Sequence, residues 1–186
     1  MLPREIRETL PESIDPDQIT AVLSLKTGLG SSWGETCVLL HGTRMLALSR
    51  DSVLDPFQVL ELDAETPPRL DIHSWEEKLH LTAIDGKEYG LLFSELDKKE
   101  ALEGLGTMYE ALEAWPAWVA VLEFQLELAT ITERRVELMV QLGQLHLVRL
   151  DQPDKAAELF QKVLEQAPLN TEATEGLESL LGDTPQ

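Results

Sequence analysis

The sequence predicts a chain of mixed α+β class, with a strand-rich region ahead of a helical one. Between residues 18 and 94, short apolar runs alternate with turn-rich connections, a texture typical of strands joined by hairpins. Beyond residue 94, apolar residues recur every three or four positions, which is the period of one helix face. We therefore expect an N-terminal arm over residues 1–17, an antiparallel β half-barrel over 18–94, and a short array of helices over 95–186.

The composition is that of a globular protein, with 43% hydrophobic and 26% charged residues. No apolar run reaches the ~18 residues that a membrane span needs. The first residues lack the basic flank and apolar core of a secretory signal. The single cysteine, Cys37, cannot form an internal disulfide, which fits a reducing compartment. We therefore predict a cytoplasmic protein in which Cys37, within an apolar run, is a buried and unreactive thiol.

The chain is strongly acidic, with 34 acidic against 15 basic residues and a net charge of −19. The excess is shared by both halves of the chain and is not the effect of a tail. Such a surface repels nucleic acid and anionic lipid, because binding to either rests on Lys and Arg neutralising phosphates. It attracts a basic protein surface. Solubility alone explains the charge equally well.

Each part of the N-terminal region has its own pattern. The arm is bracketed by prolines and places three apolar residues on one face of a short helix: Ile6, Leu10 and Ile14. Seven short strands follow, expected at 19–25, 36–40, 45–48, 57–62, 70–75, 78–83 and 89–93. A turn at 41–44 joins the second and third strands. Asp85-Gly86 joins the last two, because this dipeptide tolerates positive φ in tight hairpin turns.

Helices account for the remainder. A helix from Ser94 to about residue 113 is apolar on more than one side, so we expect it both to close the β region and to pair with the next helix. Two apolar-striped segments follow at 136–150 and 156–164, separated by a breaker in which Pro153 suits a first helical position. Neither helix can bury its apolar stripe by itself, so the two helices must pack antiparallel against each other. A closing helix is expected at 171–181, with Ala173, Leu177, Leu180 and Leu181 facing its neighbour.

The helical half resembles the tetratricopeptide repeat. The resemblance rests on Leu142-Gly143 in one helix and on Ala156, Phe160, Leu164 and Pro168 in and after the next. An upstream copy has Leu102, Leu105-Gly106 and Tyr109, then Leu122 and Leu126, but it places Trp118 where the family has Ala and Thr130 where it has Pro. The resemblance implies a partner-binding scaffold without catalytic residues. An ordinary pair of helical hairpins with chance similarity is the alternative.

The strand-rich half looks like a bacterial pleckstrin-homology or GRAM-like domain, whose element order is seven strands and then one helix. The runs VLLHGTRMLALSR and AIDGKEYGLLFSELDKKEALEGL carry this likeness. Relatives that bind phosphoinositides have several basic residues on the first hairpin, whereas this chain has only Lys26, followed by Glu35. The resemblance therefore implies the half-barrel fold and not the lipid ligand. A simple β-sandwich or a half-barrel fragment is the rival fold.

No catalytic or cofactor motif is found in the sequence. The Gly-rich stretch 28–34 lacks both the Gly-x-Gly-x-x-Gly spacing and the Gly-Lys-Ser/Thr ending of a phosphate loop. The four histidines, at 41, 73, 80 and 146, show no metal-ligand spacing, and His146 falls on a packed helix face. We therefore predict that the chain is not an enzyme and that it holds no cofactor or metal.

Three functions fit these observations. The first is a non-catalytic adaptor that binds a protein partner through an acidic groove. The second is a structural subunit of a larger assembly, including a homo-oligomer. The third is a peripheral membrane or ligand-sensing module, which the strand-rich half favours by analogy of fold alone.

The tetratricopeptide resemblance also implies where a partner lies, because the first helix of each repeat lines a concave groove in that family. The matching positions are Glu100, Glu103, Thr107, Glu110 and Ala111 in one helix, and Glu137, Val140, Gln144, Leu147 and Val148 in the other. Four carboxylates beside a small apolar strip suit a basic, amphipathic segment of a partner protein. They do not suit a ligand that ends in a free carboxylate. A solvated helix face explains the glutamates equally well.

Overall fold

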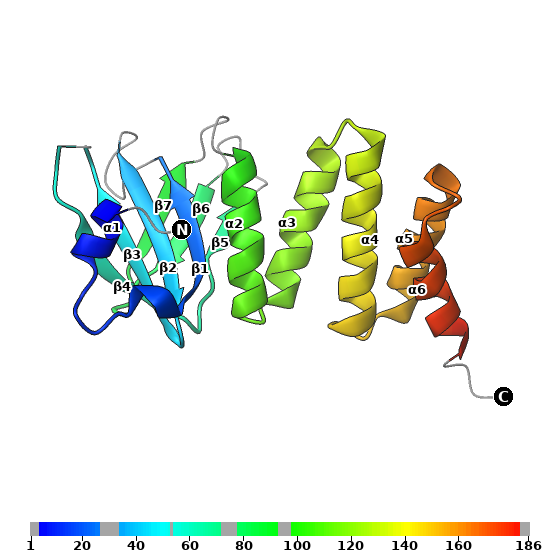
Figure 1. The fold of residues 1–186 in the computed structure, drawn as a ribbon, viewed down its shortest axis with the longest axis horizontal. Coiled ribbons are helices and arrows are strands. Elements are labelled where there is room, and N and C mark those ends of the chain that lie inside the picture. The colour runs from blue at the N-terminus through cyan, green and yellow to red at the C-terminus, as the bar shows by residue number, and fades with distance from the viewer. Residues whose placement is uncertain (1–3, 27–33, 53, 72–77, 93–97, 183–186) are drawn as a thin grey trace. The chain divides into compact units, whose positions relative to one another are not determined.

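The structure is a computed structural model that describes residues 4–26, 34–52, 54–71, 78–92 and 98–182 of the 186-residue chain (Figure 1). The mixed α+β class is confirmed, because antiparallel strands precede a series of helices. The chain divides into two compact units, Met1–Ala114 and Trp115–Gln186. Helix α2, Lys98–Ala111, belongs to the first unit, whereas the sequence grouped residues from 95 onward with the helices.

The first sheet is a four-stranded antiparallel meander in the order β1-β2-β3-β4. Its strands are β1 Ile19–Leu25, β2 Glu35–His41, β3 Arg44–Arg50 and β4 Gln58–Leu62. The predicted hairpin between β2 and β3 is confirmed, and Gly42 at its tip has a φ of 58°. Such a φ is accessible to glycine without a steric cost.

The second sheet is three-stranded, in the order β5-β6-β7, with β5 Arg69–Asp71, β6 Lys78–Thr82 and β7 Glu88–Leu92. Gly86 in the predicted Asp85-Gly86 turn has a φ of 83°. An isolated bridge, Leu62 to Ala83, connects the two sheets. The described strands thus form two joined sheets and not a closed barrel. The expected continuation of β5 to residue 75, the strand end at 93, the helix start at Ser94, His73 and most of the Gly-rich stretch 28–34 lie outside the described residues.

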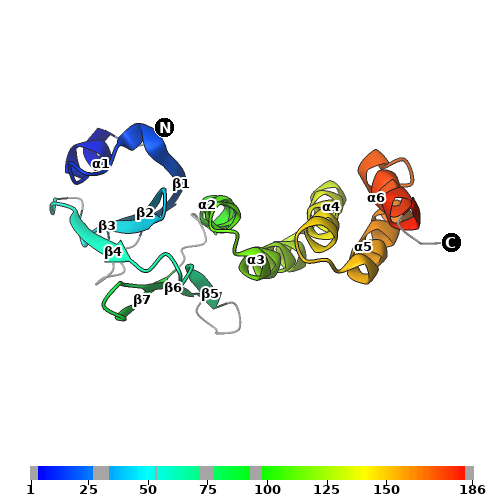
Figure 2. The ribbon, with the colours of Figure 1, turned by 90° about the horizontal axis from the view of Figure 1, so that it is seen from below.

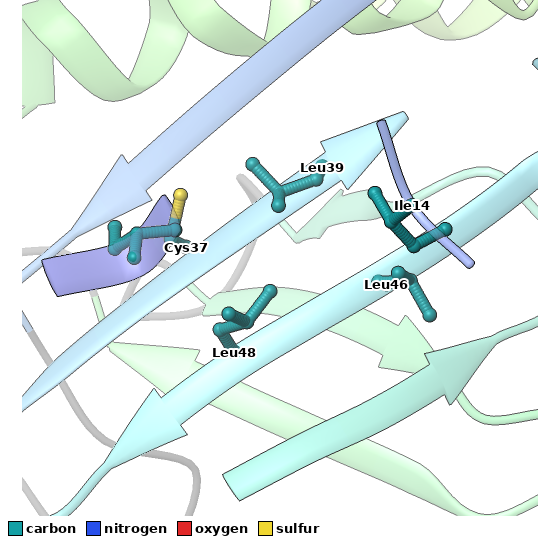
Figure 3. Packing of buried hydrophobic residues seen from close by; sticks show 6 residues of the cluster. Ile14, Cys37, Leu39, Leu46 and Leu48 are labelled. Carbon is teal, nitrogen blue, oxygen red and sulfur yellow. The ribbon is translucent and has the colours of Figure 1, made fainter. Parts of the chain in front are cut away.

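Strands β2 and β3 are buried on both faces, since each has five consecutive buried residues. Alternation places Cys37, Leu39, Leu46 and Leu48 on one face, in a cluster with Ile6 and Ile14 of the N-terminal arm (Figure 3). The arm consists of residues 4–18 and includes helix α1, Arg4–Thr9, and the 3-10 helix η1, Pro16–Gln18. The three apolar residues predicted for one helix face do pack in this cluster, but α1 ends at Thr9, so Leu10 and Ile14 lie beyond the helix.

The opposite face of the first sheet is covered by helix α2. A methyl group added at Gly104 would lie 3.2 Å from both the carbonyl oxygen of Val22 and Cδ1 of Leu23, so the helix backbone runs close to β1. At the other end of α2, the Tyr109 hydroxyl donates a hydrogen bond of 2.5 Å to the carbonyl oxygen of Pro68, just before β5. Helix α2 therefore ties the first strand to the start of the second sheet.

The second unit consists of four helices, each antiparallel to the next: α3 Trp115–Leu128, α4 Thr132–Val148, α5 Pro153–Gln166 and α6 Thr171–Gly182 (Figures 1 and 2). Pro153 is the first residue of α5, as predicted. The turn between α4 and α5 is held by the side chain of Gln152, whose Oε1 lies 3.0 Å from Nδ1 of the buried His146. The predicted role of His146 as a packed histidine bonded to a neighbour is confirmed.

The core of the helical unit is built around the ring of Phe160 on α5. A methyl group at Gly143 of α4 would lie 2.6 Å from the ring, and one at Gly176 of α6 would lie 2.5 Å from its other edge. The ring therefore occupies space that exists only because both neighbours are glycine. Ala156, Val163 and Ala173 complete this buried cluster, against which Leu177 and Leu180 pack. The expected packing of the closing helix is confirmed for these residues, and the Leu181 side chain lies outside the described part.

We expect Gly143→Ala to destabilise the protein by about 1–3 kcal/mol, because the added methyl group overpacks the Phe160 ring. The sign of this change in stability is informative, because replacing glycine by alanine inside a helix ordinarily stabilises the helix by up to about 1 kcal/mol. Urea unfolding followed by circular dichroism measures the difference. Gln144→Ala, at the exposed neighbouring position, is the control and should change the stability by less than about 0.5 kcal/mol. An unfolding midpoint raised by Gly143→Ala would contradict this packing.

Candidate protein-binding surface

Helix α4 carries a continuous exposed stripe, although α3, α5 and α6 all pack against it. The stripe consists of Glu133, Glu137, Gln141, Gln144 and Val148, spaced three or four residues apart along the whole helix. Three of these were among the predicted partner-binding residues: Glu137, Gln144 and Val148. Glu133 and Gln141 were missed, although their places one turn before and one turn after Glu137 could have indicated them.

Two of the predicted residues on α4 do not line this stripe. Val140 is only 4% exposed and packs in the Phe160 cluster with Ala173 of α6. Leu147 is half-buried and packs against the same cluster. The sequence placed both in a groove because the family's groove positions include them, but the closing helix covers this side of α4. Val140 is therefore a core residue and is not available to a partner.

The predicted residues on α2 lie in the other compact unit. Glu103, Thr107 and Glu110 are all exposed, and so is Ala111. The Thr107 hydroxyl donates to the carbonyl oxygen of Glu103 within the same helix, at 3.2 Å. Glu100 falls within α2, but its side chain is outside the described part of the chain. The α2 residues thus form a second exposed face, spaced like the stripe on α4.

The charge of the α4 stripe is partly compensated. A guanidinium nitrogen of Arg134 lies 3.1 Å from Oε2 of Glu137, one turn along the helix, and another donates to Oε1 of Gln125 on α3 at 2.9 Å. The Glu137 side chain nevertheless stays 62% exposed. An exposed ion pair of this kind contributes little to stability, so the Glu137 carboxylate can exchange Arg134 for a cation of a partner.

The C-terminal end of the stripe is apolar. Val148 is 69% exposed, so the stripe ends in an aliphatic side chain that faces solvent. The next residue, Arg149, places its guanidinium carbon 4.6 Å from the centre of the Trp115 ring, and Trp115 in turn contacts Trp118. A polar stripe therefore ends in a small apolar and aromatic area.

Other features of the described residues concern metal binding, membrane spans and pockets. No group of three or more His, Cys, Asp or Glu side chains in these parts could hold a metal ion. No described helix is long and apolar enough to cross a membrane. Two pockets, of about 500 and 430 Å³, lie on the first unit. The larger lies among the β3–β4 connection, β4, Lys87 and Tyr89, and the smaller lies beside the N-terminal arm.

Two buried groups have raised pKa values, and burial is the main cause in both. It raises the pKa of the Cys37 thiol from 9.0 to about 11, with a smaller opposing effect of the Ser24 hydroxyl 3.7 Å away and a further rise from the charge of Glu35. Burial also raises the pKa of Tyr109 well above its ordinary value. Both groups are protonated near neutral pH, and a protonated thiol is a poor nucleophile. Cys37 is therefore a packed side chain here.

Comparisons with family models, with curated proteins and with solved structures find no match for this chain.

The raised pKa of Cys37 makes stability depend on pH in a defined window. The folded state holds the thiol proton more tightly than the unfolded state does. The contribution of the protonated thiol to the free energy of unfolding is therefore complete below pH 9 and is lost as the pH rises from 9 to about 11. We expect a loss of about 2 kcal/mol over this range that is absent in Cys37→Ala. Urea unfolding of both proteins at pH 8, 9, 10 and 11 gives the difference and cancels the effect of Tyr109. Parallel curves for the two proteins would contradict the burial of the thiol.

Proposed function

We propose that this chain is a non-catalytic protein-binding adaptor and that the exposed stripe of α4 is its contact surface for a partner. The observation that supports this most directly is the stripe itself, since α4 packs on three neighbouring helices and still presents one uninterrupted face. A rigid helix held in this way offers its side chains at little entropic cost on binding.

The packing around Phe160 supports a tetratricopeptide-like arrangement of the helical unit. In stacked repeats, each helix pair cannot bury its apolar face alone and does so against the next helix. Here Phe160 of the α4–α5 hairpin lies against Gly176 of α6 as well as Gly143 of its own hairpin. In this proposal α6 corresponds to the first helix of a following repeat. Surfaces of such arrays are used for protein recognition in that family.

The chemistry of the stripe favours a partner segment that is basic at one end and apolar at the other. Glu133 and Glu137 supply negative charge, Gln141 and Gln144 supply amide donors and acceptors, and Val148 supplies an apolar contact. An amphipathic helix with Lys or Arg on one turn and an aliphatic residue about three turns away matches this order. The chain's net charge of −19 would speed the encounter with such a segment.

The first unit has the element order of a pleckstrin-homology or GRAM-like domain, and we propose that it belongs to this architecture. The support is the division into a four-stranded and a three-stranded antiparallel sheet, followed by a helix that packs on β1. In this proposal the first unit is a scaffold, and the helical unit carries the partner.

The adaptor function is tested by charge reversal with matched controls. Proteins captured from a native lysate by the full chain are identified, and the dissociation constant of the purified partner is then measured by titration calorimetry. We expect Glu137→Lys and Val148→Asp each to weaken binding by about 1–3 kcal/mol without changing the unfolding midpoint. Glu158→Lys on α5 and Leu169→Asp, which make the same chemical changes at exposed positions off the stripe, should leave the affinity within about threefold.

Salt provides a second readout. For the wild-type chain, the affinity should fall as ionic strength rises, and this dependence should weaken in Glu137→Lys, because one attractive charge pair has been replaced by a repulsive one. An unchanged affinity in both stripe variants would place the contact surface elsewhere on the chain.

A further inference from the structure

The N-terminal arm covers an apolar face of the first sheet in the manner of a bound ligand. Ile6 and Ile14 are 7% and 4% exposed, and they pack with Cys37, Leu39, Leu46 and Leu48 on the outer face of β2 and β3. Figure 3 shows Ile14 reaching over Leu39 and Leu46 from the arm, while the sulfur of Cys37 lies against helix α1. Leu10 packs on the same cluster from between them.

The arm is held by apolar packing together with exposed polar contacts. Helix α1 has only six residues, well short of the length at which an isolated helix is stable in water. Two polar contacts join the arm to β3: Oε2 of Glu5 lies 3.2 Å from Nη2 of Arg50, and the Ser13 hydroxyl accepts from Nη1 of Arg44 at 3.2 Å. The Glu5 side chain is 72% exposed, so water competes for this ion pair. A segment held in this way opens locally more readily than the sheet unfolds.

The surface beneath the arm is held in shape without it. Strands β2 and β3 pair along their whole length, so the face does not depend on the arm for its backbone order. Arg50 is also fixed by groups outside the arm, because its Nε donates to Glu35 at 3.0 Å and its guanidinium lies 4.4 Å over the Phe57 ring. Arg44 is likewise paired with Glu61 at 3.0 Å. When the arm leaves, an apolar strip remains between two positioned arginines.

This surface selects a ligand by charge and length. Arg44 and Arg50 are the first and last residues of β3, which places them about 20 Å apart at the rise of an extended strand. Each arginine already pairs with a glutamate of the sheet, and each also contacts an acceptor of the arm, which is Glu5 for Arg50 and the Ser13 hydroxyl for Arg44. A ligand that replaces the arm therefore matches the surface best with a carboxylate at one end and an acceptor at the other. The arm meets this requirement with Glu5, two isoleucines and Ser13. The pocket of about 430 Å³ along α1, lined in part by Ser24, Cys37 and Phe57, shows that the arm does not fill this edge.

We propose that the outer face of β2 and β3 is a second protein-binding surface, that the arm occupies it within the chain, and that an acidic amphipathic segment of a partner protein displaces the arm. The partner segment carries a carboxylate for Arg50, aliphatic side chains in the places of Ile6 and Ile14, and an acceptor for Arg44. This proposal is independent of the stripe on α4, since it concerns the other compact unit and a ligand of opposite charge. The arm then keeps the surface closed until such a partner is present.

The single cysteine reports directly on the position of the arm. Cys37 is 2% exposed beneath α1, and its burial also holds the thiol protonated. Labelling by a thiol reagent at pH 8 should therefore be slow while the arm is docked and faster once it has left. The full-length protein thus carries its own probe, and no truncation is needed.

The first experiment compares labelling rates of Cys37 in three full-length variants. Ile6→Asp puts a charge into the apolar contact and should speed labelling by at least about 100-fold. Glu5→Gln keeps the apolar contact and weakens only the ion pair with Arg50, so its rate should rise by about two- to fivefold. Glu12→Lys, at an exposed arm position, is the control and should label like the wild type. The β-sheet circular dichroism should be unchanged in all three, and its loss in Ile6→Asp would overturn the proposal, because the arm would then be part of the folded core.

The second experiment supplies the ligand in trans. A synthetic peptide with the sequence of residues 4–18 is added to Ile6→Asp, whose own arm no longer competes. We expect the peptide to slow Cys37 labelling by about tenfold or more, and to bind this variant at least about tenfold more tightly than it binds the wild type. A peptide with aspartate in place of both isoleucines should do neither. Equal effects of the two peptides, or no protection by either, would overturn the proposal.

Light scattering separates the partner from a second copy of the chain. We expect Ile6→Asp to remain monomeric at the concentrations used for labelling. A dimer of the wild type whose Cys37 labelling slows with protein concentration would show that the arm of another copy is the ligand, and it would overturn the assignment to a partner protein.

Discussion

The burial of β2 and β3 on both faces is the constraint on which the first unit depends. An antiparallel sheet commonly packs one face on a core and leaves the other in water, and its strands then alternate between apolar and polar residues. Here the middle of the central hairpin is buried on both faces and almost entirely apolar, so each face needs its own cover. Helix α2 packs on one, and the N-terminal arm covers the other. The two covers differ in kind, because α2 is fixed by Gly104 and Tyr109, whereas the arm is held by two isoleucines and exposed polar contacts.

The two proposed surfaces have opposite chemistry. The stripe on α4 combines carboxylates and amides with an apolar end, while the face of β2 and β3 lies between two arginines. The charge of each proposed surface disfavours binding of the segment that suits the other surface. An adaptor built in this way can therefore bind two different segments selectively. This matters for a chain of net charge −19, on which a non-selective attraction for basic proteins is otherwise expected.

Much of the local structure could be predicted from the sequence, because it depends on short-range patterns. The strands, the Asp85-Gly86 turn and the helix start at Pro153 all follow from neighbouring residues. What could not be predicted depends on contacts between distant segments. The sequence singled out Gly106 by family likeness, yet the close approach of α2 to β1 is made by Gly104. Val140 was placed in a groove, but α6 packs over it, and Gln141 was missed because no family position corresponds to it. The docking of the arm could not be predicted either, because three aliphatic residues in a proline-bracketed segment do not specify which surface they cover.

The packing of Phe160 between two glycines also restricts how this chain can change in evolution. Three residues on three helices share one volume, so a larger side chain at Gly143 or Gly176 is acceptable only after the ring has become smaller. If the Phe160 ring is lost first, the core has a cavity until one of the glycines is replaced by a larger residue. Substitutions at these positions are therefore expected to arise together in descendants of this sequence. The three residues behave as one inherited unit, although they are 17 and 16 positions apart along the chain.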